Sequence, residues 1–131
     1  MILLDTHTLI WWVSADAALS TRAKDAIDDA LGSSEILISS ITAWEIAMLV
    51  TRERLVLSMD VESWLATVAQ IDNVRFIAIN NDIAIKSTQL PGNFHKDPAD
   101  RMIVATARKF SIPLVTKDEK ILAYPHVKKI W

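Results

Sequence analysis

Two patterns of hydrophobic and polar positions alternate along the chain. The first is a short unbroken apolar run such as Ile2-Leu3-Leu4, which is typical of a strand covered on both faces. The second is a longer segment in which apolar residues recur at helical spacing. The apolar runs predict strands at residues 2–5, 35–39, 74–79, 113–116 and 127–131. The helical segments lie between them, at residues 7–14, 21–31, 41–52, 60–71, 81–89, 98–110 and 118–123.

Local signals place several boundaries and indicate the fold class. Ser20 is a favourable N-cap for the second helix, and Gly32 is predicted to end it. Pro91-Gly92-Asn93 marks a loop, and Pro113 suits an edge strand. Strands that alternate with helices favour right-handed crossovers and an α/β fold, with a mainly parallel sheet and helices on both faces. Residues 1–131 contain no repeat or linker and are expected to form a single domain.

Composition narrows the classes of function. The absence of cysteine excludes disulfides, thiolate metal sites and a cysteine nucleophile. Gly32 and Gly92 are the only glycines, so no glycine-rich phosphate loop, GxGxxG motif or GxSxG elbow exists. The first strand leaves no room for a signal peptide, and the longest apolar run, residues 9–13, is far below the ~20 residues of a spanning helix. We therefore expect a cytoplasmic protein without a membrane partner.

The net charge of −2 argues at first against a nucleic-acid partner, because phosphate-binding proteins usually carry a basic excess. The balance changes if some acids are neutralised by metal ions. With five of the 16 acids set aside, the 14 basic residues outnumber the remaining 11 acids. The hydrophobic content of 51% and the five tryptophans fit either an apolar surface for a partner or a tightly packed core.

Four acids stand out because of where they occur. Asp5 directly follows the first strand, and ligands of parallel α/β sheets collect at the carboxyl ends of strands. Glu45 lies in the middle of an apolar helical stripe, where an unpartnered carboxylate is expensive. A purely structural explanation for Glu45, without any role in function, would be an ion pair with Arg52 or Arg54.

The other two of these acids, Asp100 and Asp118, and the nearby Asp97 have stronger structural explanations. Asp100 heads the buried face of its helix, although the helix dipole also favours an acid there. Asp97, followed by Pro98, is a good helix N-cap. Asp118 comes just after a strand and suits the N-cap of the last short helix. The structural explanation is adequate for each acid alone and much weaker for four acids in comparable settings.

Carboxylates forced together repel one another, and hard divalent cations relieve that repulsion. Mg²⁺ and Mn²⁺ prefer oxygen ligands and can orient water for attack on a phosphodiester. Thr6 and Thr116, next to two of the acids, are auxiliary candidates that would hold water by hydrogen bonds. His7, Arg101 and Lys117 are candidates for substrate contact. Their structural alternatives are a cap or surface histidine, a salt bridge from Arg101 to Asp97, and a solvated lysine.

Four segments together resemble the PIN-domain ribonucleases, in particular the VapC-type toxins of type II toxin–antitoxin pairs. The segments are Met1-Ile-Leu-Leu-Asp5-Thr-His, Thr42-Ala-Trp-Glu45-Ile, Phe94-His-Lys-Asp97-Pro-Ala-Asp100-Arg-Met-Ile-Val-Ala-Thr-Ala107 and Leu114-Val-Thr-Lys-Asp118. The resemblance implies a three-layer α/β/α fold with a sheet of about five strands. It also implies Mg²⁺- or Mn²⁺-dependent cleavage of RNA, homodimerisation and inhibition by a small cognate antitoxin.

Position by position, the resemblance assigns the catalytic and metal-binding acids. Asp5, Glu45, Asp100 and Asp118 match the first to fourth acids of the family, and Asp97 is auxiliary. We expect the four carboxylates to line one pocket within reach of shared divalent ions. Apolar side chains on the early and middle helices would anchor an antitoxin helix or else belong to the core. They are Trp11, Trp12, Trp44, Met48 and Trp64.

Two other functions fit parts of the pattern. A catalytically idle PIN-like module that binds protein or RNA would share the fold, but the intact acids argue against it. A receiver-like phosphorylation domain also gathers acids at strand ends. That domain would need paired acids near its start and a lysine after a late strand, which a lone Asp5 with a helix-borne Glu45 fits poorly.

Overall fold

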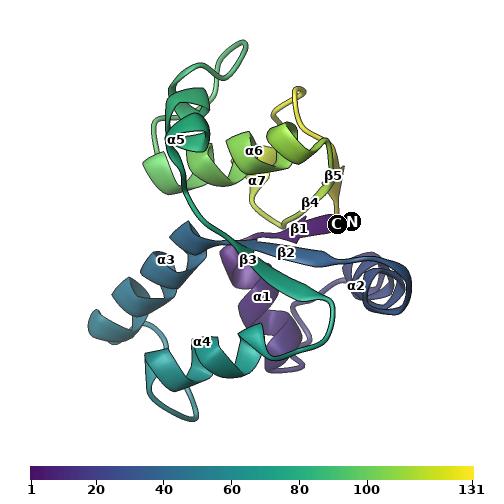
Figure 1. Cartoon of the computed structure of the whole chain (residues 1–131), viewed down its shortest axis with the longest axis vertical. Coiled ribbons are helices and arrows are strands. Elements are labelled where there is room, and N and C mark those ends of the chain that lie inside the picture. Colours follow the sequence, from purple (N-terminus) through teal and green to yellow (C-terminus); the bar gives the residue numbers. More distant parts are fainter.

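A computed structural model describes residues 1–131 and contains one sheet of five parallel strands. The strand order is β3-β2-β1-β4-β5, and every neighbouring pair is parallel (Figure 1). The strands are β1 Ile2–Leu4, β2 Ile36–Ser39, β3 Val74–Ile77, β4 Leu114–Val115 and β5 Lys129–Ile130. The predicted α/β class and parallel sheet are therefore confirmed.

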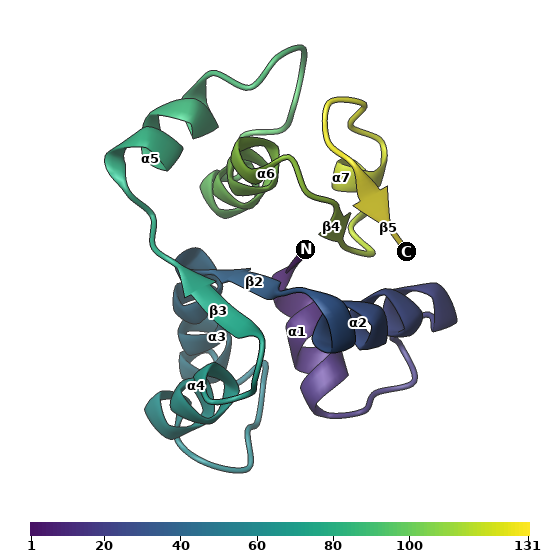
Figure 2. The same cartoon turned by 45° about the vertical axis from the view of Figure 1, so that its right-hand side comes forward.

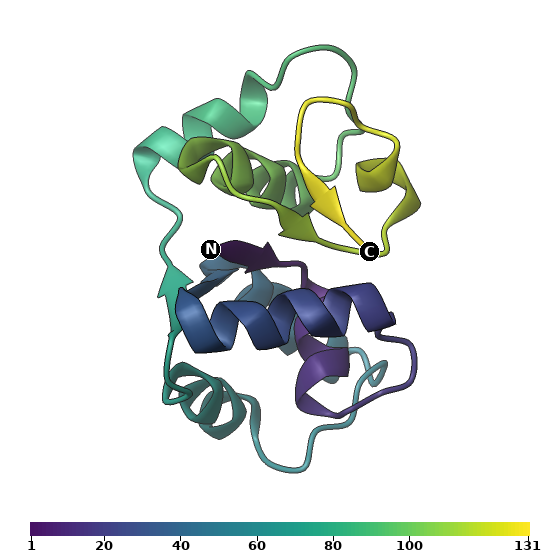
Figure 3. The same ribbon diagram turned by 90° about the vertical axis from the view of Figure 1, so that its right-hand side faces the viewer.

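Seven helices cover the two faces of the sheet. They are α1 Thr6–Val13, α2 Thr21–Ser33, α3 Ser40–Thr51, α4 Val61–Ala69, α5 Asn81–Thr88, α6 Pro98–Phe110 and α7 Glu119–Leu122. Figure 3 shows α5, α6 and α7 on one side of the sheet, with α1, α2 and α4 on the other. Figure 2 shows α3 running alongside α4 from the end of β2. The arrangement is the three-layer α/β/α fold that the resemblance implies.

The unbroken apolar runs of the strands supply two separate cores. Along β1, Ile2 and Leu4 face the α1, α2 and α4 side, whereas Leu3 faces α5, α6 and α7. Leu37 of β2 repeats the position of Leu3, with which it is in register. Because successive strand residues point to opposite faces, a strand that is covered on both sides needs apolar residues at every position.

The topology creates a switch point between β1 and β4. From β1 the chain proceeds outward through β2 and β3, and the remaining strands β4 and β5 lie on the other side of β1. Ligands of open α/β sheets bind at the carboxyl ends of the strands where the order reverses in this way. Asp5 and Asp118 follow the two strands that flank this point.

Several details of the predicted elements differ from the structure. β3 ends at Ile77 rather than at residue 79, and β5 spans Lys129–Ile130 rather than residues 127–131. Gly32 does not end α2, which continues to Ser33, because glycine is tolerated within a helix at a modest cost. β4 spans two residues rather than residues 113–116. Pro113 does not lie on an edge strand, since β4 pairs with both β1 and β5. Its carbonyl accepts a hydrogen bond from the Leu3 amide, and its missing N–H falls just before the strand.

None of the helices combines the length and the apolar character that crossing a bilayer requires.

Candidate functional site

Asp5 is held in a buried position directly after β1. Its side chain is the N-cap of α1 and accepts a hydrogen bond from the Thr6 amide at 2.8 Å. The Thr116 hydroxyl donates to the other carboxylate oxygen at 2.7 Å. Only 9% of Asp5 is exposed. Two neutral donors therefore fix the orientation of this carboxylate without neutralising its charge.

Thr116 also connects Asp5 to Asp118. Its hydroxyl oxygen accepts a hydrogen bond from the Asp118 amide at 3.0 Å. One Asp118 oxygen accepts from the amides of Lys120 and Ile121 and so caps α7. The capping role expected from the sequence is present, and it leaves the second Asp118 oxygen without a protein partner.

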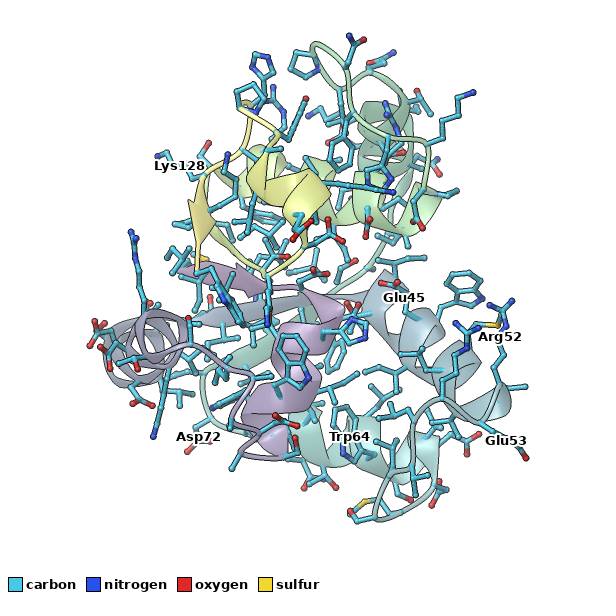
Figure 4. All side chains as sticks on the ribbon, turned by 180° about the vertical axis from the view of Figure 1, so that it is seen from behind. Glu45, Arg52, Glu53, Trp64, Asp72 and Lys128 are labelled. Carbon is cyan, nitrogen blue, oxygen red and sulfur yellow. The ribbon has the colours of Figure 1, made fainter.

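Glu45 reaches the same region from α3. The Thr6 hydroxyl donates to a Glu45 oxygen at 2.6 Å and lies 3.0 Å from the Thr42 hydroxyl. Neither Arg52 nor Arg54 forms an ion pair with Glu45, so the structural explanation proposed for this acid is wrong. Figure 4 shows Glu45 at the sheet end of α3 and Arg52 at the opposite end of the helix.

Two further acids lie at the start of α6. Asp97 caps the helix by accepting a hydrogen bond from the Asp100 amide at 3.1 Å, as the sequence predicts. Asp100 is partly buried, and its Oδ2 lies 2.9 Å from Nε2 of His95. That nitrogen is buried but has no hydrogen bond of acceptable geometry. Sequence reasoning missed His95 at this site because a residue in a loop follows no helical spacing.

Arg101 has a structural role that differs from both sequence interpretations. Its Nε donates to the Ser87 carbonyl at 2.8 Å, and its Nη1 donates to the carbonyls of Phe94 and His95 at 3.0 and 3.1 Å. The guanidinium therefore ties the loop that carries His95 to α6. It forms no salt bridge with Asp97, and its donors are directed at backbone rather than at a substrate phosphate.

His7 and Lys117 lie exposed beside the acids. Both approach Trp11, with 5.7 Å between the rings of His7 and Trp11 and 5.8 Å from the Lys117 ammonium to the indole centre. The indole thus places one cation and one imidazole near Asp5 and Asp118. Neither His7 nor Lys117 forms an ion pair with an acidic side chain.

The pKa values of the acids reflect burial first and mutual repulsion second. Burial, together with the charges of Asp5, Asp97, Asp118 and Glu45, raises the pKa of Asp100 to about 7. Burial also raises the pKa of Asp5 and of Glu45, while the hydrogen bonds from Thr116 and Thr6 oppose these shifts. All five carboxylates thus lie within electrostatic range of one another.

The four acids lie within electrostatic range of one another, but they do not all line a single cavity. Glu45 and Asp97 line a cavity of about 420 Å³, whereas Asp97, Asp100, Asp118 and His95 line a neighbouring one of about 470 Å³. Asp5, directly after β1, lines neither of these two cavities. The position of a side chain on a helix depends on how that helix crosses the sheet, which the sequence does not specify.

The donor atoms of the site are suited to a hard divalent cation, but the side chains are too far apart to bind one together. The donors are carboxylate and hydroxyl oxygens, which Mg²⁺ and Mn²⁺ prefer, and no lysine or arginine forms an ion pair with these acids. However, no three of the His, Asp and Glu side chains lie close enough to hold one ion as placed. Shared ligation therefore requires side-chain rotation at Asp100 and Asp118, while Asp5 and Glu45 remain held by threonines.

The tryptophans expected to anchor a partner differ in how far they are exposed. Trp64 is 7% exposed and belongs to the core, so it is not a surface anchor. Trp11 and Trp12 are partly buried against the same core. Trp44 is 56% exposed, and the half-buried Met48 lies one turn further along α3. Trp44 is therefore the one tryptophan of this set that is mostly exposed.

Comparisons with known proteins agree with the architecture. The family model of the PIN domain matches residues 2–127. Ribonuclease VapC22 of Mycobacterium tuberculosis is 36% identical over 129 residues, which cover 98% of this chain and 95% of that protein.

Solved structures share the fold at lower sequence identity. The crystal structure of VapBC2 from Rickettsia felis bound to a promoter DNA fragment has a TM-score of 0.71 at 18% identity, covering 98% of this chain and 97% of that chain. VapC20 of Mycobacterium tuberculosis, described as a sarcin-ricin loop cleaving toxin, has a TM-score of 0.64 at 17% identity, covering 98% and 99%. At these identities the structures support the fold alone.

The raised pKa of Asp100 predicts that stability falls with rising pH in the presence of a chelator. Between the ordinary value of 3.8 and about 7, folded Asp100 keeps a proton that the unfolded chain has lost. The stabilisation is therefore complete below the ordinary value and is lost as pH rises through about 7. Thermal unfolding in EDTA should give a lower Tm at pH 7 than at pH 5.

Asp100→Asn should flatten this dependence, because asparagine has no proton to lose. Asp25→Asn on the exposed surface of α2 is the matched control and should leave the profile unchanged. Parallel profiles for the wild type and Asp100→Asn would contradict the assignment.

The threonine that joins Asp5 to Asp118 predicts a measurable loss of stability. Thr116→Val keeps the shape but leaves a buried Asp5 oxygen and the Asp118 amide without their partner. We expect the free energy of unfolding to drop by about 1–3 kcal/mol. Thr116→Ser keeps the hydroxyl and should lose much less. Urea denaturation of both variants measures their free energies of unfolding. If Thr116→Val is as stable as the wild type, the proposed contribution of the Thr116 hydroxyl is wrong.

Proposed function

The chain belongs to the PIN-domain family, and we propose that it is a metal-dependent endoribonuclease that acts as the toxin of a toxin–antitoxin pair. The observation that carries the proposal is the gathering of Asp5, Glu45, Asp100 and Asp118 around the carboxyl ends of β1 and β4. The 36% identity to Ribonuclease VapC22 supports RNA as the substrate.

The four acids are the proposed ligands of Mg²⁺ or Mn²⁺. Such an ion, when bound, supplies positive charge that activates water and stabilises charge on the phosphate during hydrolysis. Asp5 is pre-oriented by Thr6 and Thr116, and Glu45 is oriented by the Thr6 hydroxyl. These threonines are positioning residues, which keep the buried carboxylates from rotating away.

The raised pKa of Asp100, about 7, leaves this carboxyl group partly protonated near neutral pH. It must lose that proton before it can bind a cation. Asp97 adds negative charge while it caps α6, which is an auxiliary role. Among the basic candidates, His7 and Lys117 are free to contact substrate phosphate, whereas Arg101 is a structural residue.

The proposed partners are an antitoxin, an RNA and a second copy of the chain, all in the cytoplasm. An antitoxin segment fits the apolar cavity of about 540 Å³ between α1 and the segment after α3. Trp11, Leu55, Leu57 and Trp64 are among the residues that line it. The antitoxin role rests on relatives whose solved structures are toxin–antitoxin complexes.

Cleavage of RNA should depend on a divalent ion. The purified protein is expected to cut single-stranded RNA with Mg²⁺ or Mn²⁺, to lose activity in EDTA and to regain it when Mn²⁺ is restored. Gel analysis of labelled RNA measures the rate. Cleavage that survives thorough chelation would refute the metal mechanism, and a folded protein that binds RNA without cutting it would be an idle binding module.

The roles of Asp100 and Asp97 are separable by matched substitutions. Asp100→Asn removes a proposed ligand and should lower the cleavage rate on the order of a hundredfold or more. Asp97→Asn should keep measurable activity, since asparagine caps helices about as well as aspartate. Rates at saturating Mn²⁺, with circular dichroism as the folding control, compare the two. An inactive Asp97→Asn beside an active Asp100→Asn would reverse the assignment.

A further inference from the structure

The cavity of about 420 Å³ beside the acids is lined mainly by one face of α3, and we refer to it as the α3 cavity. Ile41, Trp44, Met48 and Arg52 recur along the helix at spacings of three or four residues, so they share one face. The facing wall is formed by His7 and by the start of α6 at residues 97–99. A volume of this size suits a small-molecule ligand or a single nucleotide.

Trp44 is the most informative side chain of this wall. More than half of it is exposed, and none of the aromatic contacts within the chain involves it. An exposed indole beside a cavity offers a flat apolar face, on which any of the four nucleobases can stack.

Charge is distributed unevenly along the α3 cavity. Glu45 and Asp97 lie at the end that joins the acid cluster. Arg52 and Arg54 line the cavity as well, and neither forms an ion pair with an acid. Figure 4 shows Glu45 and Arg52 separated along α3. Unpaired arginines suit phosphate oxygens, which they can contact with two parallel hydrogen bonds.

We propose that the α3 cavity is a nucleotide subsite for single-stranded RNA, with one base stacked on Trp44 and the adjoining phosphate bound by Arg52 or Arg54. The inference rests on the proposed function and deepens it by locating the substrate. The nucleotide in the subsite neighbours the scissile phosphate, because the cavity opens onto the acids through Glu45 and Asp97.

The lining favours RNA over a protein helix. An amphipathic helix needs a run of apolar contacts, and these are more continuous in the adjoining cavity around Trp11, Leu55 and Leu57. The α3 cavity instead combines one exposed aromatic side chain with two carboxylates and two arginines. This combination of groups suits a base and its phosphate next to a cation-dependent acid cluster.

RNA binding in EDTA tests the subsite without cleavage. Anisotropy of a short fluorescein-labelled single-stranded RNA should show that Trp44→Ala weakens binding about tenfold, while Trp44→Phe keeps most of the affinity. Ile85→Ala on α5 is the matched control, because Ile85 is also a large exposed apolar residue and does not line the α3 cavity.

The arginines are tested by the salt dependence of the same binding. Arg52→Ala combined with Arg54→Ala should reduce the slope of log K against log salt by about 1 for each phosphate that the variant no longer binds. Arg22→Ala on the exposed face of α2 should leave the slope unchanged. In Mn²⁺, Trp44→Ala should raise KM for RNA and leave kcat near the wild-type value.

The alternatives give different results. If Trp44→Ala binds and cleaves RNA like the wild type, the subsite is wrong while the proposed function stands. If Trp44→Ala keeps its RNA affinity but changes the oligomeric state or no longer binds the antitoxin, a protein occupies the α3 cavity. If the folded wild type neither binds nor cleaves RNA, the proposed function and the subsite both fail.

Discussion

The site depends on one constraint: its carboxylates are buried, and no lysine or arginine side chain neutralises them. Asp5 and Glu45 are held by threonine hydroxyls and a backbone amide, which satisfy hydrogen bonds but leave the charge in place. An ionised carboxylate in such surroundings is costly. The raised pKa values of Asp5, Glu45 and Asp100 express that cost.

The basic residues nearest to the site are placed so that they do not relieve this charge. Arg101 directly follows Asp100, yet its guanidinium is directed at three backbone carbonyls. Arg52 and Arg54 lie beyond Glu45 at the far end of α3. A site that neutralised its own acids would have little affinity for a divalent ion, so neutral donors preserve the charge that attracts one.

The α3 cavity adjoins the apolar cavity between α1 and the segment after α3. His7, Leu49 and Arg54 line both of them, so an occupant of one lies next to an occupant of the other. The first combines Trp44 with charged groups, and the second is mostly apolar. An antitoxin bound in the apolar cavity would therefore border the proposed RNA path, which gives inhibition a steric basis.

The sequence alone determined the elements and the acids, whereas the tertiary structure decided the partners of the side chains. Apolar periodicity located every strand and helix, and Asp5, Asp97 and Asp118 were placed at strand ends or helix caps, because these features depend on neighbouring residues. The sequence did not reveal the hydrogen bond from Thr6 to Glu45, the backbone contacts of Arg101 or the contact of His95 with Asp100. Such contacts join residues of different elements, and their distances are set by how α3 and α6 pack across the sheet, for which no local spacing provides a signal.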